Sequence, residues 1–170
     1  DGYRPRIATE KRISEMLLGQ SASKSSTIVA VGMGGVGKSC IKSSIVRSFE
    51  IRRFFVDGIA WIVLSQKPDI PALQRKLHFQ LLGRHLEPKP SQEEQHASIV
   101  KAIAGRKVLV VIDDCWQLEH FSMLDVVDST ASSRTLVSSR ITGIVPGSDE
   151  VQLALMTGAF ESLRVWVQAN

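Results

Sequence analysis

Apolar and polar residues follow each other along the chain in blocks that predict strands and helices in alternation. An uninterrupted apolar run bounded by polar residues or glycine is typical of a strand that is buried on both faces. The run at residues 27–32 is of this kind, and the apolar-rich runs at residues 58–65, 107–114, 134–139 and 150–155 predict four more strands.

Stretches with apolar residues three or four positions apart lie around these runs and predict amphipathic helices. The first covers residues 9–18, with Thr9 as its expected cap and Gly19 as its stop. The others are predicted at residues 37–49, 69–83, 91–105 and 156–170.

Two of these helices carry more detailed expectations. In the helix over 37–49, a stripe that runs from Ile41 to Phe49 is expected to face the core. The helix over 69–83 is expected to begin after a cap at Asp69, with Pro71 in its first turn.

Strands that alternate with helices predict an α/β fold, with a five-stranded parallel sheet and helices on both faces. A length of 170 residues suits one domain. We expect an N-terminal helix and connector at 1–26, a sheet-based domain at 27–155 and a C-terminal helix at 156–170.

Composition excludes some protein classes. The chain is 44% hydrophobic and 22% charged, as in ordinary globular proteins. No apolar run approaches the roughly 20 residues of a membrane helix, and the first residues are too polar for a secretory signal. We therefore expect a cytoplasmic protein that does not bind membranes.

Cys40 and Cys115 match neither a metal site nor a disulfide framework, so free thiols are expected.

Charge adds little to this picture. Lysine and arginine number 21 and acidic residues 17, so the net charge is +4. Basic residues are scattered, except for Arg52 and Arg53 after a helix that also carries Lys42 and Arg47. Such a face could contact nucleic acid, but no aromatic residues are interleaved to stack on bases. We interpret these residues as solvated charge and expect no nucleic-acid binding.

The segment "VGMGGVGKSC" contains a phosphate-loop motif: Gly32, four residues, Gly37, Lys38 and Ser39 match G-x-x-x-x-G-K-[ST]. Glycines let the backbone N–H groups converge on a phosphate. Lys38 would then contact the β and γ phosphates, and the Ser39 hydroxyl would ligate Mg²⁺. A flexible turn is the alternative, but a strand before the loop and a helix after it favour nucleotide binding. The predicted contacts are Gly32, Met33, Gly34, Gly35, Val36, Gly37, Lys38, Ser39 and Cys40.

Three further residues follow predicted strands. Asp113 and Asp114 end the third apolar run, and ligands of parallel sheets bind at the carboxyl ends of strands. Asp113 would hold Mg²⁺ and Asp114 would orient or deprotonate an attacking water. Arg140, just past the fourth run, would contact the γ phosphate or stabilise its charge. The alternatives are a solvated Asp-Asp turn and a surface arginine.

Together, four segments resemble the NB-ARC domain of the STAND ATPases, which include plant immune receptors and animal apoptosis adaptors. They are "VGMGGVGKS", "FVDGIAWIVLSQ", "KVLVVIDDCW" and "SSRTLVSSR". The resemblance implies a P-loop NTPase three-layer sandwich in which the strand before Arg140 lies between the strands that precede Gly32 and end at Asp113. It also places Pro5, Arg6 and Ile7 near adenine.

The resemblance further implies an ADP/ATP switch for defence or cell-death signalling that hydrolyses ATP slowly to reset itself, with protein partners or self-association in the full-length protein. Family members continue into a small helical domain with a "GLPL"-type motif and a winged-helix domain with an "MHD"-type histidine. Neither motif occurs here. We therefore expect a fragment, with 156–170 starting a helical lid, or a chain that has lost its lid.

Two other functions stay open. A small phosphotransferase would use the same loop, but it needs an acceptor pocket and an arginine-rich lid. The Asp113–Asp114 pair and Arg140 suit water attack better than an alcohol acceptor. A degenerate fragment that folds but binds nucleotide poorly is the other alternative.

Overall fold

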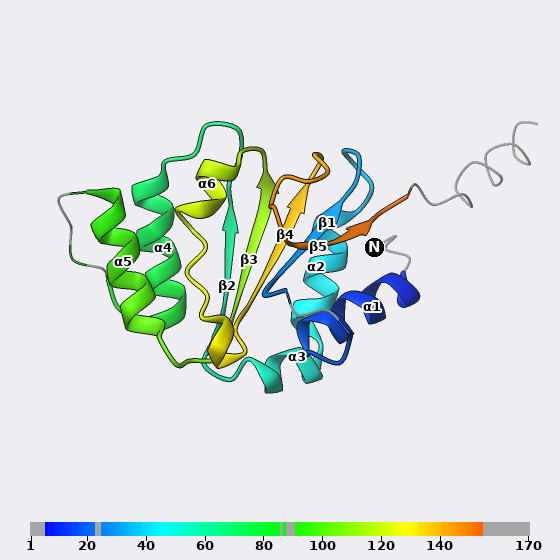
Figure 1. Ribbon diagram of the computed structural model, residues 1–170, viewed down its shortest axis with the longest axis horizontal. Coiled ribbons are helices and arrows are strands. Elements are labelled where there is room, and N and C mark those ends of the chain that lie inside the picture. Colours follow the sequence, from blue (N-terminus) through cyan, green and yellow to red (C-terminus); the bar gives the residue numbers. More distant parts are fainter. Residues whose placement is uncertain (1–5, 23–24, 86, 88–90, 155–170) are drawn as a thin grey trace, which may run out of the picture.

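The strands form one parallel sheet, as predicted. The computed structural model describes residues 6–22, 25–85, 87 and 91–154. The strand order is β2-β3-β4-β1-β5, and every neighbouring pair is parallel (Figure 1). The strands are β1 (Thr27–Val31), β2 (Gly58–Val63), β3 (Val108–Cys115), β4 (Arg134–Ser139) and β5 (Asp149–Gln152). The position of β4 between β1 and β3 agrees with the order that the family resemblance implies.

Helices cover both faces of the sheet (Figure 1). One face packs against α1 (Ile7–Leu17), α2 (Lys38–Arg47) and α3 (Phe49–Phe54), and the other against α4 (Ile70–Leu82), α5 (Gln92–Ile103) and α6 (Leu118–Ser122). A short 3₁₀ turn spans Ser129–Ala131. This is the predicted three-layer α/β sandwich.

The buried residues form two hydrophobic cores, one on each face of the sheet, and alternate side chains of β3 belong to different cores. Val108, Val110 and Ile112 pack on the α4 side, whereas Leu109 and Val111 pack on the α2 side. Side chains of a strand point alternately to opposite faces, so an apolar run is required wherever helices cover both of them. This is why β1 and β3 are apolar at every position over residues 28–31 and 108–112.

The predicted cap of α4 is confirmed. The Asp69 side chain accepts a hydrogen bond from the Ala72 amide at 3.0 Å, and a proline occupies the first turn. The cap of α5 follows the same rule, because Ser91 Oγ accepts from the Glu94 amide at 3.1 Å.

The single helix predicted at 37–49 is wrong. Ser48 adopts an extended conformation, with ψ of 142°, and its hydroxyl accepts from the Ile51 amide at 3.3 Å. It therefore ends α2 and caps α3, since a serine at this position competes with helix continuation. As a consequence, Phe49 is 75% exposed and does not face the core.

Thr9 is not the cap of the first helix. α1 begins at Ile7, and the Glu10 carboxylate accepts from the Arg6 amide at 3.0 Å. The helix predicted at 156–170 lies outside the described residues, and the division into 1–26, 27–155 and 156–170 stays a prediction. Among the helices that the structure describes, none is long and apolar enough to cross a bilayer.

Candidate functional site

The phosphate loop connects β1 to α2, and close packing explains its first glycine. A Cβ on Gly32 would lie 2.8 Å from the Leu153 carbonyl oxygen and 3.0 Å from a Val36 methyl group. Gly37 has a different requirement: it precedes α2 with φ of 91°, in the left-handed region. The loop is thus shaped by glycines at both ends, as the motif predicts.

Lys38 lies across the loop that precedes it. Its Nζ donates to the carbonyl oxygens of Gly32, at 2.6 Å, and Met33, at 2.8 Å. These bonds hold the ammonium against the backbone of the loop whose amides the motif is expected to direct at phosphate.

Ser39, in the first turn of α2, and Asp113, near the carboxyl end of β3, come together as predicted. Ser39 Oγ donates to Asp113 Oδ2 at 2.8 Å. β3 is irregular at this point, with a shift in its register against β4 between Ile112 and Cys115. The irregularity leaves both acids half-buried at the edge of the site.

Asp114 and Arg140 face the same loop. Asp114 has φ of 58°, in the left-handed region that aspartate adopts more readily than most residues other than glycine. Its carboxylate lies 3.9 Å from Arg140 Nε. The Arg140 guanidinium stacks over the Trp116 ring at 5.1 Å and approaches Gly34 so closely that an added Cβ would lie 3.2 Å from it. Both predicted catalytic residues therefore lie beside the phosphate loop.

Lys42 is a member of the site that the sequence analysis missed. Its side chain is fully buried, and its Nζ contacts Asp113 Oδ1 and donates to Ser138 Oγ at 2.6 Å. The interpretation of Lys42 as solvated charge is wrong. A signal was available, since position 42 follows Lys38 by one helical turn and shares the buried side of α2 with Ile45.

Ser138 links the two acids. It donates to Asp113 Oδ1 at 2.5 Å and accepts from the Asp114 amide at 3.1 Å. Being fully buried on β4, it joins that strand to β3 within the site. The sequence did not single out Ser138, because it is one of several polar residues in the strand predicted at 134–139.

Burial and charge shift three pKa values. Burial lowers the pKa of the Lys42 ammonium to about 8, against the opposing effect of Asp113. Burial also raises the pKa of Asp113, but the Lys42 charge and the hydrogen bonds that Asp113 accepts outweigh it and leave that pKa below its usual value. Burial and the nearby Arg140 lower the pKa of Lys38. The Lys42–Asp113 pair is therefore mainly ionic at neutral pH.

The residues present do not fit Mg²⁺ in the predicted way. A hydroxyl and a carboxylate are suitable ligands, and Ser39 and Asp113 provide them. However, the Lys42 ammonium already neutralises Asp113 from the buried side.

These groups converge on one pocket of about 400 Å³. It lies at the carboxyl ends of the central strands, which is where parallel sheets bind ligands. Its lining is Gly34, Gly35, Gly37, Lys38, Ser39, Cys40, Val63, Asp113, Asp114 and Arg140. Nine of the twelve predicted site residues, from three separate segments, line this pocket, whereas Gly32, Met33 and Val36 do not.

Residues 8–166 match the NB-ARC domain family, which accounts for most of the chain. The chain belongs to this family. The resemblance drawn from the four motifs is thereby confirmed.

Similar NB-ARC proteins include two from Arabidopsis thaliana. Disease resistance protein RPP13 is 27% identical over 146 residues, which cover 82% of this chain and 17% of that protein. Disease resistance protein RPP8 is 23% identical over 168 residues, or 94% and 18% of the two chains. The chain spans less than a fifth of the length of these relatives.

Solved structures share the fold of this NB-ARC chain. The Aeropyrum pernix ORC1 protein, in complex with DNA, aligns with a TM-score of 0.60 at 15% identity, over 99% of this chain and 50% of that one. A Drosophila ORC structure bound to DNA gives 0.59 at 14% identity, over 89% and 44%. At such low identities the structural similarity shows the fold alone. It confirms the α/β P-loop NTPase class. Fold and family together imply nucleotide binding.

Arg6, the first described residue of the NB-ARC chain, is hydrogen-bonded to the phosphate loop. Its guanidinium donates to the Ala154 carbonyl oxygen at 2.6 Å and to the Val36 carbonyl oxygen at 2.9 Å. Ile7 is next to it and is 75% exposed. Pro5, the third residue expected near adenine, lies outside the described residues.

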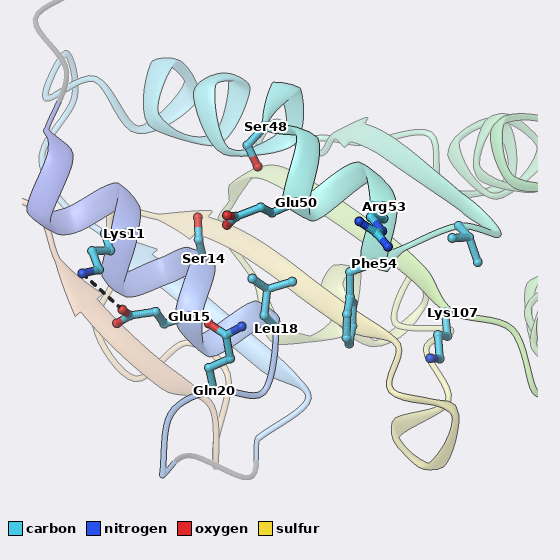
Figure 2. Close-up of a pocket in the computed structure, with 11 residues that line it drawn as sticks. Lys11, Ser14, Glu15, Leu18, Gln20, Ser48, Glu50, Arg53, Phe54 and Lys107 are labelled. Carbon is cyan, nitrogen blue, oxygen red and sulfur yellow. Dashed lines mark ion pairs between the residues drawn. The ribbon is translucent and has the colours of Figure 1, made fainter.

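A larger pocket, of about 850 Å³, lies between α1 and α3 (Figure 2). Figure 2 shows an ion pair between Lys11 and Glu15 on its α1 wall, with Phe54 and Lys107 at the other end. None of the described residues that line it belongs to the predicted nucleotide site. We therefore assign the candidate site to the smaller pocket.

The two cysteines differ in environment. Both are free, as predicted, and Cys40 is exposed at the nucleotide pocket whereas Cys115 is buried. Burial raises the pKa of the Cys115 thiol to about 11. Cys115 therefore packs in the core as a neutral thiol.

Proposed function

We propose that this chain is the nucleotide-binding core of a defence-signalling switch, which binds ADP and ATP and hydrolyses ATP slowly. One observation carries the proposal: Lys38, Asp114 and Arg140, from three segments, line one pocket beside the phosphate loop. Each has the chemistry for a different part of the nucleotide or of the water that attacks it.

The roles follow from position. The loop amides of residues 32–40 would hold the β phosphate and Lys38 the β and γ phosphates, because they surround the N-terminus of α2. Arg140 would contact the γ phosphate, and Asp114, 3.9 Å away, would orient the attacking water. We infer that hydrolysis resets the switch.

Signalling belongs to the longer proteins that this chain resembles. Two of these relatives are named as disease resistance proteins, which supports a defence role. Protein partners or self-association would arise in the full-length protein. A cytoplasmic location and a lack of nucleic-acid binding stay predictions; binding to DNA is a property of the two structural neighbours.

Replacing Arg140 with alanine tests the proposed switch directly. We expect titration calorimetry to show ATP affinity lowered about tenfold and ADP affinity changed little, because a charged hydrogen bond to one phosphate is lost. Arg75→Ala, at an exposed position of α4, is the matched control. Equal losses for ATP and ADP would show that Arg140 does not distinguish the γ phosphate, and no binding of either nucleotide by the unaltered chain would refute the function.

Replacing Asp114 with asparagine should spare nucleotide binding but slow hydrolysis about 100-fold, the usual contribution of a general base. Asparagine is preferred to alanine because it tolerates the left-handed backbone at this position. The measurement is a single-turnover assay with ATP. An unchanged rate would remove Asp114 from the mechanism.

A further inference from the structure

Lys42 is a buried charged residue whose desolvation cost is offset by its contacts. A fully buried lysine is rare, because removing an ammonium from water is costly unless it is paired. Lys42 contacts Asp113 Oδ1 and Ser138 Oγ, and its Nζ lies 5.2 Å from the centre of the Trp61 ring. The Lys42 ammonium is therefore paired with the Asp113 carboxylate.

Asp113 is the acid that a phosphate-loop protein uses to hold Mg²⁺ together with the loop hydroxyl. Here its two oxygens have different partners: Oδ2 accepts from Ser39, and Oδ1 accepts from Lys42 and Ser138. A cation added between Ser39 and Asp113 would meet an acid whose charge is already balanced. It would also face the Lys42 ammonium, a like charge close by in a poorly solvated region.

Lys42 itself cannot act as a second phosphate ligand in this arrangement. Its side chain has no exposed surface, and Ser39 and Asp113 line the pocket in front of it. Its charge can still favour a phosphate chain in the pocket, because it cancels the negative charge of Asp113, which would otherwise repel phosphate through a weakly screened region.

We propose that Lys42 is a built-in counter-ion that takes the place of Mg²⁺ at Asp113, so that this site binds ADP without a divalent cation. The inference rests on the proposed nucleotide-binding function. It also predicts that the proposed hydrolysis is slow, because Lys42 supplies one positive charge where Mg²⁺ supplies two.

The test is calorimetric titration of the chain with ADP, once with excess MgCl₂ and once with EDTA. We expect the two affinities of the unaltered chain to differ by less than about threefold. In Lys42→Met the side chain keeps its length but loses its charge, so ADP affinity in EDTA should fall at least about tenfold below that in MgCl₂. Lys101→Met, at an exposed position of α5, should behave like the unaltered chain.

The outcomes separate this inference from the proposed function. If the unaltered chain binds ADP in MgCl₂ but loses at least about tenfold in EDTA, nucleotide binding stands and the role of Lys42 is overturned. No binding in either buffer would overturn both. The comparison of buffers in the unaltered chain decides the matter even if Lys42→Met fails to fold.

Discussion

Replacing Lys38 with alanine should lower the affinity for ADP and ATP at least about 100-fold, since charged hydrogen bonds each contribute about 1.5–3 kcal/mol. The ammonium lies over the loop carbonyls of Gly32 and Met33, at the point where the phosphates are expected. The side chain is only half-buried, so the fold should survive its loss.

Two measurements check the Lys38 prediction. Calorimetric titration gives the affinities, and denaturing the purified chain followed by chromatography identifies any nucleotide that copurifies. We expect ADP from the unaltered chain and none from Lys38→Ala. Lys76→Ala, at an exposed position of α4, controls for the loss of a surface charge. Unchanged affinity in Lys38→Ala would refute the phosphate-loop assignment.

Replacing Asp113 with alanine should destabilise the protein by about 3–5 kcal/mol, because Lys42 would remain buried without its counter-charge. The reverse change is milder. In Lys42→Met, Asp113 keeps its hydrogen bonds to Ser39 and Ser138 and its 13% exposed side chain lies at the pocket.

Urea unfolding of the two single variants and the double variant measures this asymmetry. Lys42→Met in the Asp113→Ala background should restore most of the lost stability, because it removes the unpaired charge. If the losses simply add, the ion pair makes no contribution to the fold.

Much of the fold could be predicted from local pattern. The run from Val108 to Ile112 is apolar at every position because helices cover both faces of β3, and alternation between strands and helices implied a parallel sheet. The order of the strands came from family resemblance, because pairing of distant segments leaves no local trace. Ser48 shows the limit of periodicity: its hydroxyl starts a new helix where the apolar pattern continued.

The site residues that belong to a motif or follow a predicted strand could be predicted from the sequence. Lys38 and Ser39 followed from the loop spacing, and Asp113, Asp114 and Arg140 from the position of parallel strand ends. Lys42 was missed because it was judged by residue type. Its partners are 71 and 96 residues away in the chain, so only the folded sheet explains why a lysine occupies a buried position of α2.

Arg6 joins the phosphate loop to the chain that follows β5. One of its nitrogens holds the Val36 carbonyl oxygen of the phosphate loop, and the other holds the Ala154 carbonyl oxygen just after β5. Leu153, beside Ala154, also packs against Gly32 so closely that no side chain fits between them. A displacement of the chain after β5 would therefore break these hydrogen bonds or move the phosphate loop, so we expect movement at that strand to alter nucleotide affinity.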